Sequence, residues 1–414
     1  MVFVLCKFFF LLLCAFWVPG YLEIKTIDLG VDLFFQDGHA LKLKGKRVGL
    51  ITNHTGVGSD LSPTYERFMQ NTEGFSLSAI FSPEHGFQGE IYAEKSCDDI
   101  VSFKGVPVFS LYGEHRRPTQ KMLENIDVLV YDIQDIGSRS YTYVTTLFYV
   151  MEEAAKCGIP VVVLDRPNPM GGEIVDGPML EKKWASFIGY IDVPYCHGMT
   201  VGELARYFNK EYQVGCQLDV VPMRGWRREM LYQETGLAWI PTSPYIPEDD
   251  SPLFYATTGI IGSLSIVSIG IGYTLPFKVI GAPWIKSESF AQALNKQKLS
   301  GIKFVPFHFR PQFGLFKGQS CEGVLLVITN KHTFKPLTIQ YLILGILKSM
   351  YPIQMNEGLA RLDQLRKDQF CKACGNQEML DLLIKEKYVA WKLMQYQKQD
   401  REMFIEKRKK YLLY

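Results

Sequence analysis

The sequence has no excess of charge of either sign. Its 414 residues include 45 lysines and arginines against 43 aspartates and glutamates, which leaves a formal charge of +2. A nucleic-acid-binding protein needs a clearly basic face, and only the short tract 407–410 approaches one. A basic end of a solvated helix is the simpler interpretation of that tract. We therefore expect no nucleic acid partner.

Cysteine is too sparse and too scattered to form a disulfide framework. Two of the nine cysteines lie in the first twenty residues, and the other seven are odd in number and widely spaced. The one close pair, Cys371 and Cys374, has no second pair with which to hold zinc and no thioredoxin-like surroundings. The pair is predicted to be either a loop disulfide or two unreactive thiols.

The sequence also lacks the common motifs for nucleotides, metals and serine nucleophiles. It has no Walker A lysine motif, no Gly-x-Ser-x-Gly elbow and no His-Glu-x-x-His. Gly-x-Gly occurs at 56–58 and at 270–272, but Leu61 stands where a dinucleotide fingerprint requires its third glycine, and the second stretch fails likewise. We predict no cofactor and no metal ion.

An apolar stretch opens the chain. Residues 1–20 contain Lys7 as their only charge, which is typical of an export signal, although no clean small-x-small cleavage site follows. An uncleaved anchor is the alternative, because the run 2–18 is near the lower length limit for spanning a bilayer. Lipid attachment at Cys14 is a third alternative. We expect the folded part outside the cytoplasm, in contact with a membrane only through an uncleaved leader.

Apolar runs alternate with helical patterns from residue 46 onward. The predicted strands lie at 48–51, 77–81, 106–111, 128–130 and 161–164. The predicted helices lie at 64–70, 119–124 and 143–157. Strands that are apolar throughout are typical of a parallel sheet covered on both faces, so the fold class is α/β. Residues 21–214 are predicted to form a Rossmann-like, doubly wound catalytic domain and 215–414 a second α/β or α+β domain that completes the cleft.

Polar side chains follow the predicted strands at the point where each strand ends. In a doubly wound sheet, ligands bind outside the carboxyl ends of the strands. The side chains that gather at that edge are Asn53, Glu84, His85, Asp132, Asp135, Asp165, Arg166 and Asn168. This arrangement predicts a polar cleft.

The stretch 82–89 is the strongest candidate for the chemistry. Pro83 excludes a central ladder position and Gly86 permits an unusual backbone angle, so the chain turns after a buried strand. Glu84 and His85 are thereby presented side by side on a loop, where catalytic groups tend to lie. A surface turn that happens to carry both residues is the alternative.

Two further segments supply candidate ligand-binding groups. The block 131–143 is dense in hydrogen-bonding and aromatic side chains, including Gln134, Arg139 and Tyr143, as a carbohydrate site requires. A strand-to-helix connection with a satisfied Asp–Arg pair is the alternative. His197 precedes a helix that Thr200 and Glu203 begin as a capping box, where a polar or anionic ligand group is favoured. A capping-loop histidine without a ligand is equally open.

Six blocks, taken together and in order, resemble one known family. They lie at 82–89, 131–137, 165–169, 197–204, 281–284 and 410–414. The family is that of the exo-acting β-N-acetylmuramidases of bacterial wall recycling, the NamZ type, and the resemblance spans 29–414. It implies a Rossmann-like domain, a second α/β domain and a cleft between them. It also implies release of terminal N-acetylmuramic acid from the non-reducing end of peptidoglycan fragments, in the periplasm or at a membrane facing it.

The resemblance has two departures. The stretch 244–248 differs from the Pro-Asn-Met-Pro-Thr block that is usual in the family. Ile261, Ile269 and Ile271 stand where the family usually has two glutamates and an arginine. Replacing charge by an aliphatic side chain removes pairing that a buried polar ligand needs. The alternative function is therefore a catalytically impaired muropeptide-binding or wall-associated protein of the same fold.

A glycosidase mechanism can be assigned to these residues. Glu84, which matches the family's candidate catalytic glutamate, is the expected general acid with His85 beside it, and Asp132 or Asp135 is the expected second carboxylate. A route in which the sugar's own acetamido group is the nucleophile is equally open. The expected substrate-binding residues are Asn53, Gln134, Arg139, Tyr143, Asp165, Arg166, Asn168 and His197.

Overall fold

The structure is a computed structural model that describes residues 26–93 and 95–414. The predicted signal or anchor at 1–20 lies outside these residues. Among the helices that are described, none is both long and apolar enough to cross a membrane.

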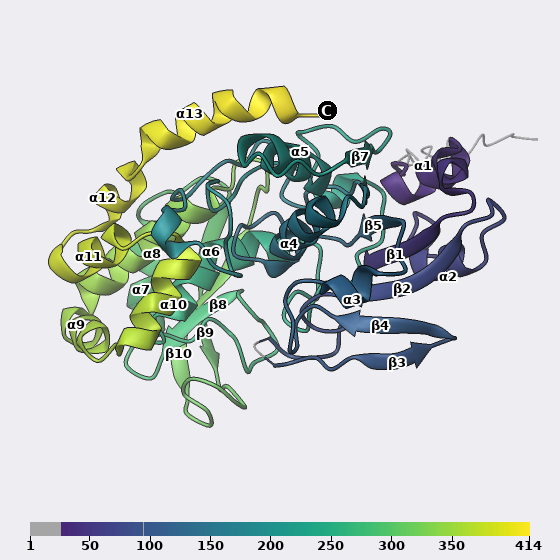
Figure 1. Ribbon diagram of the computed structural model, residues 1–414. Coiled ribbons are helices and arrows are strands. Elements are labelled where there is room, and N and C mark those ends of the chain that lie inside the picture. The colour runs from purple at the N-terminus through teal and green to yellow at the C-terminus, as the bar shows by residue number, and fades with distance from the viewer. Residues whose placement is uncertain (1–25, 94) are drawn as a thin grey trace, which may run out of the picture.

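A seven-stranded sheet forms the centre of the first unit (Figure 1). Its strands are β1 (Arg47–Thr52), β2 (Ser76–Ser82), β3 (Ile100–Phe103), β4 (Val106–Ser110), β5 (Val128–Asp132), β6 (Val161–Leu164) and β7 (Leu218–Val221). They are ordered β3-β4-β2-β1-β5-β6-β7, and every neighbouring pair is parallel except β3 and β4 at one edge. The strand order runs outward in both directions from β1 and β5, which confirms the doubly wound α/β fold.

Alternate residues of each central strand enter two different cores. In β5, Val128 and Val130 pack with α1 (Gly30–Gln36) and α2 (Thr64–Met69), on one face of the sheet. Leu129 and Tyr131 pack on the other face, with the longer helices α4 (Thr142–Cys157) and α5 (Val201–Glu211). Because successive strand side chains point to opposite faces, a strand covered on both sides must be apolar at every position.

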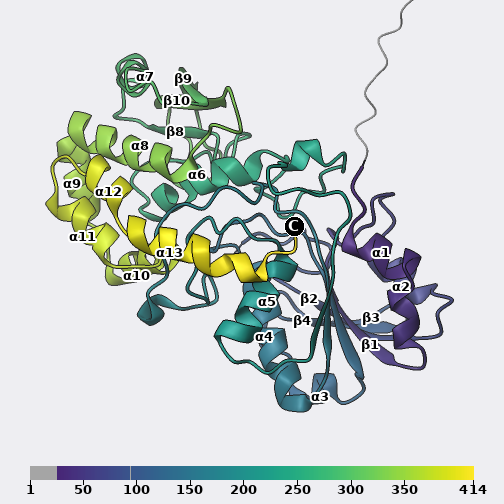
Figure 2. The same ribbon diagram turned by 90° about the horizontal axis from the view of Figure 1, so that it is seen from above.

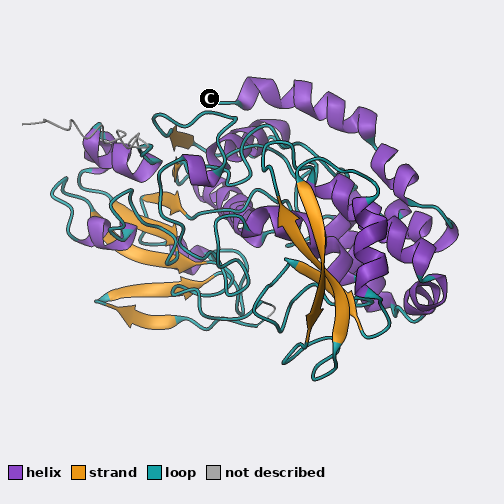
Figure 3. Ribbon diagram, turned by 180° about the vertical axis from the view of Figure 1, so that it is seen from behind, coloured by secondary structure: helices purple, strands orange, loops and turns teal. Residues whose placement is uncertain are grey.

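The second unit is a small antiparallel sheet with helices packed beside it (Figure 3). β10 (Cys321–Ile328) lies between β8 (Val279–Ala282) and β9 (Ile302–Phe309). The helices of this unit are α6 (Ser251–Ser263), α7 (Ser287–Asn295), α8 (Pro336–Met350), α9 (Pro352–Ala360), α10 (Gln364–Cys374), α11 (Glu378–Lys385), α12 (Ala390–Gln395) and α13 (Lys398–Arg408). The remaining helix, α3 (Gln120–Leu123), precedes β5 in the first unit. One continuous hydrophobic core joins α4 and α5 to α6 and α8, so the two units share their interior.

Two expectations about the second half need correction. β7 belongs to the first sheet, so the first unit continues beyond the expected boundary at residue 214. The sequence pattern predicts a single long helix from about residue 385 to the end, but the structure has two helices there, α12 and α13, because Gln397 between them has a left-handed φ of 51°. Of the two alternatives for Cys371 and Cys374, the structure shows free, buried thiols on the last turn of α10 and not a disulfide.

The C-terminal segment crosses back onto the first unit. Figure 2 shows α13 running from the second unit toward α5. Beyond it, Tyr414 donates a hydrogen bond from its hydroxyl to Asp165 Oδ2 at 2.8 Å and accepts one from the amide of Met223 at 2.7 Å. Its ring also packs edge-on against Trp226. Tyr414 thus ties the chain back to the strand ends of β6 and β7.

Substitution of Tyr414 by Phe removes both hydrogen bonds and leaves Asp165 and the Met223 amide one partner short. We expect a loss of about 1–3 kcal/mol in the free energy of unfolding, measured by urea titration, and a lower melting temperature. Tyr388→Phe is the matched control, since Tyr388 is 69% exposed. Equal stability of the two variants would contradict a tethering role for Tyr414.

Candidate active site

The loop after β2 has the turn that its sequence predicts. β2 ends at Ser82, and the amide of Gly86 donates to the carbonyl of Pro83 at 3.1 Å. His85 and Gly86 both have positive φ, 72° and 79°. A non-glycine residue in this region is uncommon and is held there by its surroundings. Here the ring Nδ1 of His85 makes a 2.6 Å hydrogen bond with the carbonyl of Ile91, so the histidine fixes the loop.

Glu84 is buried and oriented. Its side chain is 7% exposed, and Thr142 at the start of α4 donates from Oγ1 to Glu84 Oε2 at 2.6 Å. Tyr255 of α6 lies near both Glu84 and Asp135. Burial raises the pKa of Tyr255, and the nearby negative charges of Glu84 and Asp135 raise it further. The two carboxyl groups therefore belong to one site, to which the second unit contributes a tyrosine.

Asp135 is the carboxyl group with the most perturbed surroundings at this edge of the sheet. Burial raises its pKa to about 7, although hydrogen bonds from the backbone amides of Gly137 and Ile136 act in the opposite direction. The amide of Gly137 donates to Oδ2 at 2.7 Å, while Oδ1 is buried without a partner among the described residues. A carboxyl group that titrates near neutral pH is suited to proton transfer.

Several neighbouring polar atoms share this lack of a protein partner. Four of these buried atoms form no hydrogen bond with any described residue: Asn53 Nδ2, Gln134 Oε1, Asp135 Oδ1 and Ser138 Oγ. Thr55 links the first two residues, since its Oγ1 donates to Asn53 Oδ1 at 2.6 Å and accepts from the Gln134 amide at 3.0 Å. Buried polar atoms are normally paired, so such a group at strand ends indicates a place for a polar ligand.

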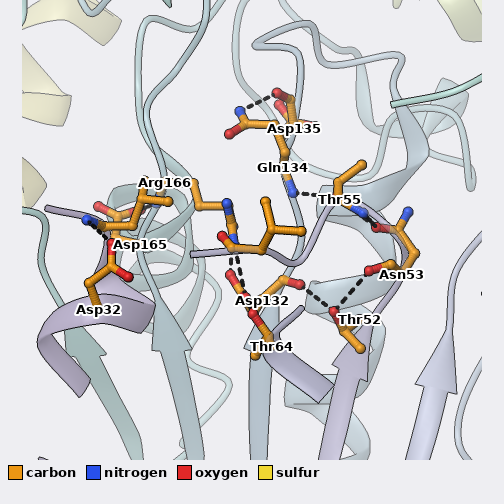
Figure 4. Close-up of polar contacts among 12 residues, drawn as sticks. Asp32, Thr52, Asn53, Thr55, Thr64, Asp132, Gln134, Asp135, Asp165 and Arg166 are labelled. Atoms are coloured by element: carbon orange, nitrogen blue, oxygen red, sulfur yellow. Dashed lines mark hydrogen bonds and ion pairs between the residues drawn. The ribbon is translucent and has the colours of Figure 1, made fainter. Parts of the chain in front are cut away.

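Asp132 has very different surroundings, as Figure 4 shows. Arg166 donates to it from Nε at 2.5 Å and from Nη2 at 2.9 Å, one bond to each carboxylate oxygen, and Thr64 donates from Oγ1 to Oδ2 at 2.5 Å. Both side chains are almost wholly buried. This ion pair joins the ends of β5 and β6 and favours Asp135 over Asp132 as the second catalytic carboxyl.

Asp165, Asn168 and His197 bond mainly to other parts of the protein. We call these three residues the frame. Asp165 accepts hydrogen bonds from Thr200 Oγ1 at 2.7 Å and from the Gly202 amide at 2.8 Å, at the start of α5. Asn168 bridges two backbone segments through the amide of Met170 and the carbonyl of Met199. His197 accepts from the Met199 amide.

His197 is kept neutral in this frame. Its pKa is lowered to about 3 by burial and by the nearby charges of Arg408 and Arg139. The capping box that places it is present, because Thr200 and Glu203 exchange side-chain and backbone hydrogen bonds. These contacts favour the capping-loop interpretation of His197.

Arg139 and Tyr143 also bond mainly to the protein backbone. Arg139 donates to the carbonyls of Pro178 and Val193 at 2.7 Å each and of Cys374 at 2.6 Å. Tyr143 donates from its hydroxyl to the carbonyl of Thr242 at 2.5 Å. Arg139 therefore ties the first unit to α10. That Arg139, Tyr143 and the frame residues bind substrate stays a prediction.

Sequence reasoning missed Thr142, Tyr255 and His54. Thr142 lies inside the polar block 131–143, but nothing in its own sequence context distinguishes it from its neighbours. Tyr255 comes from α6, and only the fold brings it to Glu84. His54 follows Asn53 and bonds through Nε2 to the carbonyl of Pro241 at 2.6 Å, while its buried Nδ1 has no partner among the described residues. The position of His54, close after the end of a predicted strand, is the signal by which the sequence could have identified it.

The three isoleucines that depart from the family pattern are core residues. Ile261 and Ile269 are buried, and Ile271 is partly buried against the same hydrophobic cluster. The side chain of Ile269 lies directly against the Cα of Gly262, on the helix that carries Tyr255. In this chain the three positions thus complete the shared interior.

Comparison with known proteins assigns the chain to a family. The family model for the N-terminal part of the exo-β-N-acetylmuramidase NamZ matches residues 48–250, and the model for its C-terminal part matches 253–414. The chain belongs to the NamZ family. It is 39% identical over 389 residues to the peptidoglycan β-N-acetylmuramidase NamZ of Bacillus subtilis strain 168, which covers 94% of this chain and 91% of that protein.

Two solved structures of the same fold resemble this NamZ family member. Both are DUF1343 family proteins from Bacteroides fragilis NCTC 9343. One superposes with a TM-score of 0.87 at 38% identity, and the other with 0.72 at 28% identity. Each comparison covers 94% of this chain and 99% of the other. The resemblance that six sequence blocks indicated is confirmed over both units.

Substitution of Asp132 by Asn leaves the buried charge of Arg166 without a counter-charge. We expect the free energy of unfolding, from urea titration, to fall by about 3–5 kcal/mol. The matched control is Asp219→Asn, which removes an exposed carboxylate 3.8 Å from Lys42 and should cost about 0–1 kcal/mol. Similar losses in both variants would show that the Asp132–Arg166 pair has no special role.

Substitution of Asp135 by Asn should change how stability depends on pH. The folded protein keeps a proton on Asp135 up to about pH 7, whereas the unfolded chain releases it near pH 4. Stability of the unmodified protein should therefore decline as pH rises from about 4 to about 7. In Asp135→Asn this decline should be smaller, by an amount on the order of 4 kcal/mol at most.

Urea titrations at intervals between pH 4 and pH 8 measure the difference. Asp165, whose pKa burial raises to about 6, contributes to the slope in both proteins alike. Parallel curves for the two proteins would mean that Asp135 is ionised at all these pH values.

Proposed function

We propose that this protein is an exo-acting β-N-acetylmuramidase that releases terminal N-acetylmuramic acid from the non-reducing end of peptidoglycan fragments. Membership of the NamZ family supports the reaction class, and the Bacillus subtilis relative carries the corresponding activity in its name. The observation that carries the proposal is the buried, oriented carboxyl group of Glu84 beside unpartnered polar atoms at the strand ends.

Glu84 is suited to the role of general acid. The hydroxyl of Thr142 holds one of its oxygens, which fixes the direction in which the carboxyl group can present a proton. Cleavage of a glycosidic bond needs such a donor next to the leaving-group oxygen. His85 supports the reaction indirectly, because its ring holds the loop that carries Glu84.

Asp135 is the proposed second carboxyl group. With Oδ1 unpartnered in the described part of the chain and a pKa of about 7, it can exchange a proton with a bound group at neutral pH. It acts either as the base toward an attacking water or as the partner of the acetamido N–H when that group is the nucleophile. The first route inverts the anomeric configuration and the second retains it, so NMR of the first-formed anomer distinguishes them.

The substituted positions in α6 and the loop after it do not weaken this proposal. Ile261 and Ile269 belong to the interior that positions Tyr255, while Thr142, which bonds to Glu84, comes from the first unit. We further propose that the apolar leader at 1–20 directs the protein out of the cytoplasm, where a peptidoglycan-derived substrate is found. The composition of that leader supports export, with cleavage, anchoring or lipidation as its possible fates.

Substitution of Glu84 by Gln keeps the shape of the side chain and removes its exchangeable acid proton. We expect release of the aglycone from a chromogenic N-acetylmuramic acid glycoside to fall by at least about 100-fold, the lower end for loss of a general acid. Glu114→Gln is the matched control, because the side chain of Glu114 is 90% exposed. This variant should leave the turnover unchanged.

The same proteins separate the enzyme from a binding protein. Glucosaminidase-treated and amidase-treated wall fragments should yield free N-acetylmuramic acid with the unmodified protein and not with Glu84→Gln. If calorimetry shows that the unmodified protein binds a muropeptide but no assay shows turnover, the protein is a binding protein and the proposed reaction is wrong.

A further inference from the structure

A large groove lies away from Glu84, beside the C-terminal helices. Its walls come from the loop 170–176, the segments 228–231 and 331–338, and the helices α12 and α13. We call it the α13 groove. Its volume is about 590 Å³, within the range of roughly 300–1,000 Å³ that is usual for small-molecule sites. Figure 1 shows α12 and α13 at the outer edge of the molecule.

One short segment, 195–196, contacts both the neighbourhood of Glu84 and the α13 groove. Ser140, two residues before Thr142, donates from Oγ to the hydroxyl of Tyr195 at 3.0 Å. The backbones of Cys196 and Asp176 exchange two hydrogen bonds, and Asp176 lines the groove. Neither Glu84 nor Thr142 lines the groove, so the groove is distinct from the surroundings of the Glu84 carboxyl group.

The lining combines an apolar floor with an exposed indole. Ile174, Leu231 and Phe334 contribute apolar surface, and Trp391 stands at the rim with 70% of its surface exposed. A tryptophan so exposed leaves a wide apolar face in water. Such a flat face suits the apolar side of a sugar ring.

Two lysines give the groove unbalanced positive charge. Lys331 and Lys335 form no ion pair with any described residue. Two acidic residues of the lining have partners: Glu229 pairs with Arg227 outside the groove at 2.5 Å, and Glu402 pairs with Lys398, which also lines the groove, at 4.0 Å.

The other charges of the lining do not reverse this sign. Asp176 accepts a hydrogen bond from the Gly177 amide and lies near the charge of Arg401 as well as that of Lys335. Arg228 pairs with Glu203 at 2.7 Å, and His332 with Glu234 at 2.8 Å. Glu173 and Asp176 then stand against Lys331, Lys335 and Arg401, which leaves a net of one positive charge. The balance favours a ligand with negative charge.

We propose that the α13 groove is a second, non-catalytic binding site for an acidic glycan strand. The strand's sugar faces pack on Trp391, and the free lactyl carboxylates of its muramic acid residues bind Lys331 and Lys335. This inference rests on the proposed function, since that function makes peptide-free peptidoglycan strands the substrate class. The groove then holds the polymer at the surface while the site at Glu84 removes sugars from chain ends.

Two variants test the groove without touching the catalytic residues. Trp391→Ala removes the stacking face, and the double variant Lys331→Glu with Lys335→Glu reverses the charge. The matched controls are Tyr388→Ala, which removes an aromatic side chain 69% exposed but outside the lining, and Lys296→Glu with Lys298→Glu, which reverses two exposed lysines elsewhere. All are made on the Glu84→Gln background for binding and on the active background for turnover.

Binding is measured by co-sedimentation with insoluble, amidase-treated peptidoglycan, and turnover by kcat/KM on the small chromogenic glycoside. We expect roughly tenfold weaker sedimentation for both groove variants, the scale of losing one well-placed anchor, with kcat/KM unchanged. The controls should sediment like the parent. Binding by the parent should weaken with added salt, because lysine–carboxylate attraction is screened.

Three results would overturn the proposal. Unchanged sedimentation of both groove variants would exclude the groove as the binding site. Equal binding of uncharged chito-oligosaccharides would exclude recognition of the carboxylates. Sedimentation only with wall that keeps its stem peptides would assign the groove to a peptide. Failure of the proposed function gives a different result, namely no turnover of the small glycoside by the parent whatever the groove variants bind.

Discussion

The buried pair of Asp132 and Arg166 is the contact on which the edge of the sheet beside Glu84 and Asp135 depends. It joins the carboxyl ends of two neighbouring strands, β5 and β6, in a place from which water is excluded. Thr64, at the start of α2, bonds to the same carboxylate, so a helix on one face is tied to the strand ends as well. With the ends of the strands held in this way, the loops that follow them have fixed starting points.

The rest of the site follows from those starting points. The loop after β2 presents Glu84, and the segment after β5 presents Gln134 and Asp135 before α4 begins. Thr142, at the start of that helix, reaches back to Glu84. Asp132 and Asp135 are only three residues apart, yet one is neutralised by a guanidinium while the other is buried and accepts hydrogen bonds from backbone amides. Because their surroundings differ, Asp132 is suited to a structural role and Asp135 is the candidate for proton transfer.

The second unit completes the site through a shared interior. Tyr255 lies on α6, whose buried side chains enter the same core as those of α4 and α5. Two units that share a core in this way have little freedom to move apart about a hinge. The isoleucines at 261, 269 and 271 belong to this interior, so their lack of charge is compatible with a fixed position for Tyr255.

Much of the first unit could be predicted from the sequence, because strands buried on both faces leave unbroken apolar runs. The run at 128–130 was sufficient to predict β5, and the capping box of Thr200 and Glu203 was sufficient to predict the start of α5. The role of Asp132 could not be predicted, since its partner lies 34 residues away and either a substrate or an arginine could have taken that place. Tyr255 and the break at Gln397 were equally inaccessible, because each depends on packing between distant segments.

The contact between Tyr414 and Asp165 has a consequence for how the molecule is assembled. These residues are separated by 249 positions in sequence, and Arg408 also reaches back to the backbone of His197. Loop closure over such a separation is slow compared with local helix formation. The strand ends of β6 and β7 therefore acquire their full set of partners only after nearly all of the described chain has been synthesised. A nascent or truncated chain would expose this edge, and with it an unfinished surface open to aggregation.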